Sequence, residues 1–135
     1  MDGARIAIVS IPVSDQSRAK EFYCQGLGFL PLLDTTFEQD GRTQRWVMLG
    51  LPDGGTAITL VTWFETMPAG ALRGMVVSVS DIERAARDLA SRGVAGAESP
   101  IQESPWGRWI TVEDPDGNAW VIQQDRLPAG HTASL

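Results

Sequence analysis

The apolar positions of the first half of the chain follow a strand period and then a helix period. An Ile- and Val-rich run at 6–13 predicts a strand. Ser14 or Asp15 then offers an N-cap oxygen, and apolar residues at helical spacing over 19–23 predict a helix that ends at Gly26. Three further strands are predicted at 29–34, 44–49 and 56–61.

The second half of the chain repeats this order of elements. A strand is predicted at 74–79, and Ser80 with Glu83 forms a capping box at the start of the next helix. The apolar face of that helix spans 82–89, and Gly93 ends it. The strands predicted after it lie at 94–97, 108–112 and 119–123.

Short strings of sequence recur in the same order and at nearly the same spacing, which indicates an internal repeat. Val-Ser-Asp followed by Arg-Ala occurs at 13–19 and again at 79–85. Arg-Trp followed by Pro-Asp-Gly occurs at 45–54 and again at 108–117, and each Pro-Asp-Gly predicts a hairpin turn. The chain therefore divides into module one at 4–62, a linker at 63–73, module two at 74–125 and a tail at 126–135.

Each module has the order β-α-β-β-β, which predicts an α+β fold. Such a sheet has one face covered by its helix and one face free. Two modules in tandem can join their sheets into a concave mixed sheet that encloses a cavity, with the helices outside. We therefore expect one domain over 1–135 that is built from two similar halves.

Strand alternation predicts which side chains face that cavity. The resulting lining is apolar and aromatic, with a few hydroxyls and one amide, and is typical of a small-molecule pocket. The predicted lining residues are Ile8, Ser10, Trp46, Met48, Thr59, Val76, Ser78, Trp109, Thr111, Val121 and Gln123. The alternative is that the tryptophans among them are ordinary core or dimer contacts.

Composition limits the partners and the location. The 135 residues carry a formal net charge of −6 and no basic cluster, so neither nucleic acid nor a membrane surface is an expected partner. Neither a signal peptide nor a transmembrane run is visible. Cys24 is the single cysteine and cannot close a disulfide within the chain, which favours a cytoplasmic location.

The sequence assigns no catalytic residue. The single histidine, His131, lies in the predicted tail, which removes most imidazole mechanisms. Cys24 lies beside aromatic helix residues and is interpreted as a core thiol, and the acidic segment 38–40 as a polar loop. Asp53 and Asp116 are interpreted as turn residues rather than as metal ligands.

The motifs of both modules resemble those of the vicinal oxygen chelate superfamily, the glyoxalase, bleomycin-resistance and extradiol dioxygenase group. The resemblance is carried by Val13-Ser14-Asp15, Phe22-Tyr23, Leu27-Gly28-Phe29 and 114–118 (Asp-Pro-Asp-Gly-Asn). It implies a glyoxalase-like fold, a homodimer, and a divalent metal held by the first and last strands of each module. That metal acts as a Lewis acid on two vicinal substrate oxygens.

The positions that correspond to the family's metal ligands do not carry ligand side chains. They fall on Ile8 and Thr59 (or Ile58) in module one and on Gly74 and Val121 in module two. Aliphatic residues and glycine offer no ligand atom, and threonine is a poor ligand. We therefore expect neither a metal nor another cofactor, with a divalent metal as the alternative.

Three functions remain open. The first is a metal-free binding protein that sequesters an apolar or aromatic small molecule. The second is a metal-dependent lyase or dioxygenase of the same superfamily. The third is metal-free catalysis by a carboxylate or serine. The sequence leaves undecided whether the protein is an enzyme, and whether the two modules pair within one chain or swap between chains.

Overall fold

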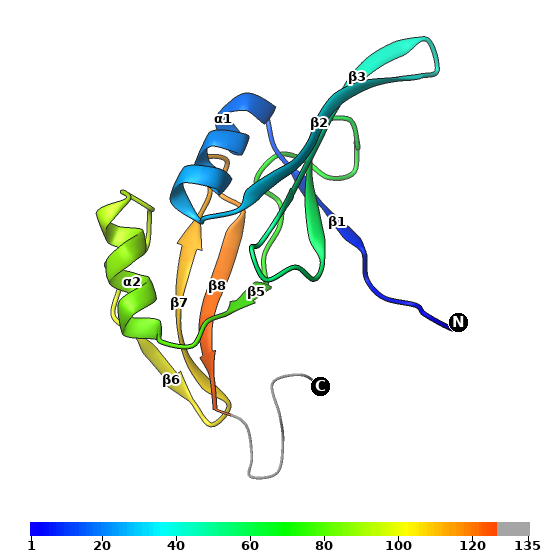
Figure 1. Ribbon diagram of the computed structural model, residues 1–135. Helices are drawn as coiled ribbons and strands as arrows, with labels where there is room; N and C mark the ends of the chain where they lie inside the picture. The colour runs from blue at the N-terminus through cyan, green and yellow to red at the C-terminus, as the bar shows by residue number, and fades with distance from the viewer. Residues whose placement is uncertain (127–135) are drawn as a thin grey trace. The chain divides into compact units, whose positions relative to one another are not determined.

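The computed structural model describes residues 1–126, which form two compact units that divide between Ala71 and Leu72. Each unit holds one four-stranded sheet and one α-helix (Figure 1). Within the described residues, no helix is both long and apolar enough to cross a membrane. His131 and the rest of the predicted tail after Arg126 lie outside the described residues.

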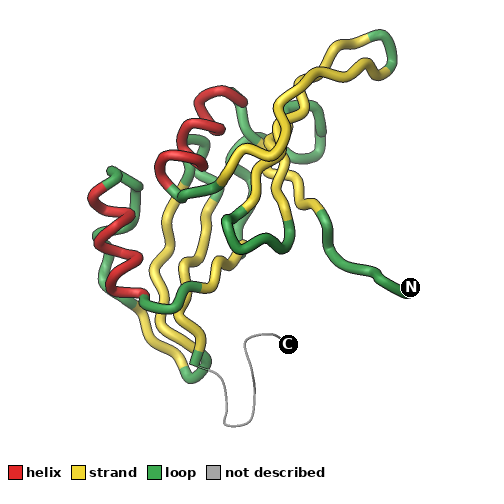
Figure 2. Tube along the Cα trace, in the orientation of Figure 1, coloured by secondary structure: helices red, strands yellow, loops and turns green. Residues whose placement is uncertain are grey.

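The first unit contains a mixed sheet of strand order β1-β4-β3-β2. β1 pairs with β4 in parallel, and the other neighbours are antiparallel. The helix α1 continues directly into a short π-helix, η1, so the helical segment coloured red in Figure 2 is continuous here. The elements are β1 Ile8–Pro12, α1 Gln16–Glu21, η1 Phe22–Gly26, β2 Leu30–Gln39, β3 Arg42–Gly50 and β4 Ala57–Val61.

The second unit repeats this topology with strand order β5-β8-β7-β6. β5 pairs with β8 in parallel, and β7 is antiparallel to both of its neighbours. Its elements are β5 Met75–Ser78, α2 Ile82–Ser91, β6 Gln102–Ser104, β7 Gly107–Glu113 and β8 Ala119–Asp125. The predicted α+β class with two tandem β-α-β-β-β modules is thereby confirmed.

The core of the first unit lies between the sheet and α1. Ile11, Leu49 and Leu60 are fully buried on this side, as is Tyr23 from the helical segment. Gln16 joins helix to sheet because its side-chain amide donates to the carbonyl oxygens of Arg45 and Leu60, at 2.7 and 2.8 Å. The opposite face of the sheet carries no helix of this unit (Figure 1).

Aspartates begin both α-helices. The carboxylate of Asp15 accepts from the backbone N–H of Arg18, and that of Asp81 accepts from Arg84, each at 3.0 Å. The predicted capping box of Ser80 with Glu83 is therefore wrong. The N-cap is one residue later, which frees the Glu83 carboxylate to bind the guanidinium of Arg108 on β7.

The predicted strand at 94–97 is wrong, because this segment forms turns and the second strand of the unit is β6. Gly93 and Gly96 have φ of +76° and +92°, values that an extended strand does not allow. The turns bring Gly96 against β7. A Cβ atom at this position would lie 2.4 Å from the carbonyl oxygen of Thr111, so the close approach requires glycine.

The acidic segment 38–40, predicted to be a loop, lies mainly within a strand. β2 runs through Glu38 and Gln39. Asp40 and Gly41 then reverse the chain with φ of +52° and +73°, which are the values of a two-residue hairpin turn of type I′. We call residues 37–44 the hairpin arm, and Figure 1 shows it reaching away from the rest of the first sheet.

Replacing Gly96→Ala tests the close approach to β7. Gly55 is a matched control, because its φ is also +92° but a Cβ there meets no atom within 4 Å. We expect Gly55→Ala to cost about 1 kcal/mol of unfolding free energy, from backbone strain alone. Gly96→Ala adds a backbone clash and is expected to cost about 3 kcal/mol. Urea unfolding measures both values, and equal losses would contradict the close approach of Gly96 to β7.

Candidate ligand-binding site

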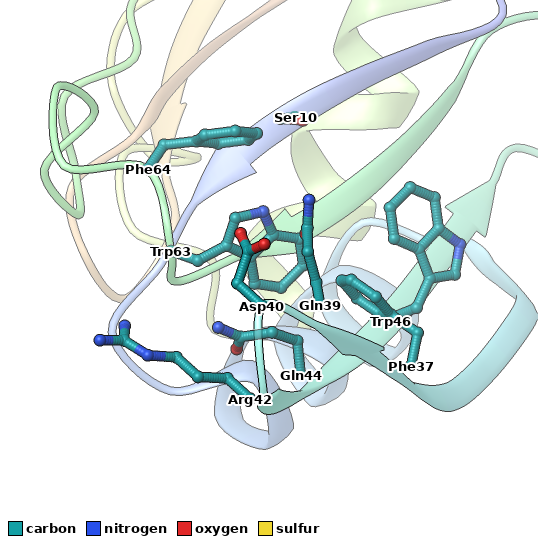
Figure 3. Close-up of a pocket in the computed structure, with 9 residues that line it drawn as sticks. All are labelled: Ser10, Phe37, Gln39, Asp40, Arg42, Gln44, Trp46, Trp63 and Phe64. Carbon is teal, nitrogen blue, oxygen red and sulfur yellow. The ribbon is translucent and has the colours of Figure 1, made fainter.

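A pocket of about 690 Å³ opens on the face of the first sheet that α1 does not cover (Figure 3). We call it the aromatic pocket. Its lining comes from the hairpin arm, from β1, from β3 and from the segment that follows β4. The lining residues are Ser10, Phe37, Gln39, Asp40, Arg42, Gln44, Trp46, Trp63 and Phe64.

Strand alternation explains why these residues share one face. Arg42, Gln44 and Trp46 are alternate residues of β3, so their side chains point to the same side. The residues between them point the other way. Register places Phe37 of β2 opposite Gln44, and therefore on the same face. The strand alternation that buries one face of the sheet therefore also places these residues on the other face.

Four aromatic rings line the pocket. The ring of Phe37 stands edge-on to two indoles, with centroid distances of 6.0 Å to Trp46 and 5.6 Å to Trp63. Trp63 in turn contacts Phe64, at 6.0 Å and a tilt of 54°. Edge-on contacts of this kind favour a fixed arrangement of rings beyond what apolar burial gives. The rings therefore support one another while still bordering an open pocket.

The end of the hairpin arm adds polar groups to this aromatic surface. The side chains involved are Gln39, Asp40, Arg42 and Gln44. Within residues 1–126, none of the four makes a side-chain hydrogen bond or an ion pair. Their donors and acceptors are therefore available to a bound molecule.

A row of small polar side chains continues this face toward β1. Ser10 and Thr59 are register partners, and their hydroxyl oxygens are 3.3 Å apart. Thr59 is fully buried, and Met48 is its partner on β3. Ser10 lines the pocket, whereas Thr59 lies beside it in the sheet and outside the lining.

The covered face of the same sheet carries an ion-pair cluster at the base of the hairpin arm. The guanidinium of Arg45 donates two hydrogen bonds to the Asp34 carboxylate, at 2.9 and 2.7 Å, and Lys20 of α1 donates a third at 2.8 Å. The Arg45 and Lys20 hydrogen bonds hold the pKa of Asp34 well below its usual range. The cluster joins β2, β3 and α1 on the face of the sheet opposite to Trp46.

The structure brings only part of the predicted lining to this pocket. Ser10 and Trp46 line it. Ile8, Met48 and Thr59 lie on the same face of the first sheet but outside the lining. In the second unit, register places Val76, Val121 and Thr111 in one row and Ser78, Gln123 and Trp109 in another. These six residues line no part of the aromatic pocket.

The sequence reasoning missed most of the hairpin arm and both aromatic residues after β4. The local signal for the arm is the Asp40-Gly41 pair, because Asp-Gly is favoured in turns of this type. With the turn recognised, alternation from Trp46 leads directly to Gln44 and Arg42. Trp63 and Phe64 fall in the segment predicted to be a linker. No local signal places them beside Phe37.

The residues at the family's metal positions do not fit a metal. Ile8 and Thr59 of the first unit are an aliphatic side chain and a hydroxyl that pairs with Ser10. Gly74 and Val121 of the second unit offer no ligand atom. Across residues 1–126, no three His, Cys, Asp or Glu side chains gather in a group that could hold an ion. No reaction step can be assigned to a metal at these positions.

Asp114 has a structural role, and the Cys24 thiol has a raised pKa. The Asp114 carboxylate accepts from the backbone N–H of Asp116 and Asn118 and from the Asn118 side chain, which fixes the turn between β7 and β8. Burial raises the pKa of the Cys24 thiol, with Lys20 opposing the shift. A thiol that stays protonated is a poor nucleophile. Cys24 is only half-buried and lies outside the buried core, so its interpretation as a core thiol is wrong.

Comparison with known proteins establishes the family. Residues 5–122 match the model of the Glyoxalase/Bleomycin resistance protein/Dioxygenase superfamily, so the chain belongs to this superfamily. The structure is similar to that of TnmS3, an antibiotic binding protein from Streptomyces sp. CB03234. The two are 37% identical with a TM-score of 0.82, over 93% of this chain and 99% of TnmS3.

Two further proteins are similar to this chain over most of its length. A superfamily member from Sphaerobacter thermophilus is 30% identical with a TM-score of 0.79, over 90% of this chain and 97% of that protein. The protein YetH of Bacillus subtilis is 26% identical over 123 residues, which is 89% of this chain and 98% of YetH.

Substituting Asp34→Asn tests the ion-pair cluster. At neutral pH we expect a loss of about 1 kcal/mol of unfolding free energy, the upper range for partly exposed ion pairs. The folded-state pKa of Asp34 is lowered, so its contribution is complete above the unfolded pKa of about 4 and declines as the pH falls further. Urea unfolding from pH 7 to pH 3 should show the gap to wild type closing below about pH 4. Asp53→Asn serves as the control, and a gap that stays constant would contradict this origin.

Proposed function

We propose that this protein binds and sequesters a planar aromatic small molecule of the antibiotic type in the aromatic pocket. The observation that carries the proposal is the group of four aromatic rings around one opening on the uncovered face of the first sheet. The relation to TnmS3, which is described as an antibiotic binding protein, supports it.

The dimensions and chemistry of the pocket suit such a ligand. A volume of about 690 Å³ lies within the usual range for small-molecule sites. Aromatic rings attract flat ligands through stacking and edge-on contacts, each worth roughly 0.5–1.5 kcal/mol beyond apolar burial. The neighbouring amides of Gln39 and Gln44 can hydrogen-bond the polar edge of a flat molecule. Apolar attraction thus supplies affinity, and the polar end supplies orientation.

Sequestration needs no catalytic group, and we propose that binding is metal-free. Support comes from the side chains at the family's metal positions, which lack ligand atoms at three of the four places. The alternative of a metal-dependent lyase or dioxygenase requires ligands that the described residues do not bring together. Capture alone lowers the free concentration of a harmful compound, so protection follows from affinity.

The substitution Trp63→Ala tests the ring cluster. Acridone, a flat neutral tricycle, is the probe, and calorimetry measures its affinity. We expect Trp63→Ala to weaken binding about tenfold, because it removes contacts to the ligand and to Phe37. Trp63→Phe keeps a ring and should retain most of the affinity. Trp106→Ala is the matched control, since Trp106 is 62% exposed and lies in the second unit. An equal loss in both alanine variants would contradict the assignment.

Metal removal tests the metal-free part of the proposal. Protein purified without a histidine tag should contain far less than one equivalent of Zn, Fe, Mn or Ni by elemental analysis. Chelation with EDTA should leave the affinity for acridone unchanged. A stoichiometric metal, with binding lost on chelation and restored by the ion, would support the lyase or dioxygenase alternative instead.

A further inference from the structure

The charged groups of the aromatic pocket point to the kind of flat molecule that it selects. Asp40 and Arg42 both line the pocket, and they do not form an ion pair with each other. A ligand of either charge would therefore find an opposite charge in the lining. The positions of these two side chains relative to the rings decide between them.

The turn places Asp40 in the same pocket lining as the aromatic residues. Asp40 occupies the left-handed region with φ of +52°, directly at the reversal of the hairpin. In Figure 3 its carboxylate extends to the side of the hairpin on which Trp63 and Phe64 lie. The guanidinium of Arg42 extends away from Phe37 and Trp46 in the same view. In this view the carboxylate, and not the guanidinium, extends toward the side of Trp63 and Phe64.

No cation of the described part of the first unit forms an ion pair with this carboxylate. Lys20 and Arg45 both bind Asp34 on the covered face of the sheet. Within the described residues, Asp40 has no hydrogen-bond or ion-pair partner for its side chain. The chain as a whole carries a net charge of −6, so its long-range field also favours the approach of cations.

Aromatic rings strengthen the preference for a cation. The faces of tryptophan and phenylalanine rings are electron-rich, and a cation within about 6 Å of a ring centroid is attracted to them. Trp63 and Phe64 supply two such faces on the side toward which Asp40 extends. An anionic group placed there would instead meet like charge from Asp40 and the negative faces of the rings.

From this arrangement, and resting on the proposed function, we propose that the pocket selects flat aromatic molecules that carry a protonated amine. Asp40 is the counter-ion, Trp63 and Phe64 contact the cation through their ring faces, and Trp46 and Phe37 contact the flat body. The positive charge of Arg42, which also lines the pocket, weakens this preference for cations. The ligand class is therefore an aromatic amine cation.

Three probes with the same linear three-ring outline separate charge from shape. Proflavine is a cation near neutral pH, acridone is neutral and anthracene-9-carboxylate is an anion. Calorimetry in low salt should give affinities in the order proflavine, acridone, anthracene-9-carboxylate. We expect about fivefold between proflavine and acridone, the effect of one close charge pair in a hydrated site. The difference should largely vanish in about 1 M salt, where the screening length is about 3 Å.

The variant Asp40→Asn assigns the preference to one residue. Asparagine also adopts the left-handed conformation, and Asn-Gly is a favoured pair for this turn, so the hairpin is retained. We expect Asp40→Asn to lower the ratio of the proflavine affinity to the acridone affinity about fivefold, because only proflavine loses a charge pair. Asp53→Asn makes the same change in net charge at an exposed position outside the lining and should leave both affinities unchanged. Arg42→Gln should strengthen proflavine binding.

The outcomes distinguish this inference from the function on which it rests. If all three probes bind equally well, or the anion binds best, the cation preference is wrong while the binding function stands. If Asp53→Asn weakens proflavine as much as Asp40→Asn does, net charge is responsible and Asp40 is not the counter-ion. If none of the probes binds to the wild-type protein, the proposed function itself is overturned.

Discussion

The site depends on the way α1 covers one face of the first sheet and leaves the other face open. In the first unit, Ile11, Leu49 and Leu60 are removed from water on the α1 side, and this burial supplies the main driving force for the unit. Because successive strand residues point to opposite faces, burying one set commits the other set to the open face. The alternate residues Gln44 and Trp46 of β3 therefore lie on the open face of a sheet whose other face is packed.

The hairpin arm turns that open face into a pocket. β2 and β3 continue past the pairing of β3 with β4, and only the type I′ turn at Asp40 and Gly41 closes them. Contacts on both faces hold the arm. On one side Phe37 packs between Trp46 and Trp63, and on the other Arg45 joins Asp34 at its base. The rings that would contact a ligand therefore also stabilise the structure that presents them.

Membership of the superfamily does not settle the chemistry of this protein. Its fold is compatible with metal-dependent enzymes and with binding proteins, so the side chains at the site have to decide between them. At the expected metal positions stand aliphatic and hydroxyl groups such as Ile8 and Thr59. Aromatic rings and unpaired polar groups lie on the same face of the first sheet. These side chains are the basis on which we propose recognition by shape and charge rather than Lewis-acid catalysis.

The sequence by itself determined the order of elements, the internal repeat and the face on which Ser10 and Trp46 lie, because these follow from local periodicity and turn chemistry. It failed at 94–97, where turns that include Gly96 with a positive φ replace the predicted strand. The tertiary structure alone decided that Trp63 and Phe64 join Phe37, since these residues are separated along the chain by two strands. Such proximity depends on how strands pair and how far a hairpin extends, and no local pattern encodes either one.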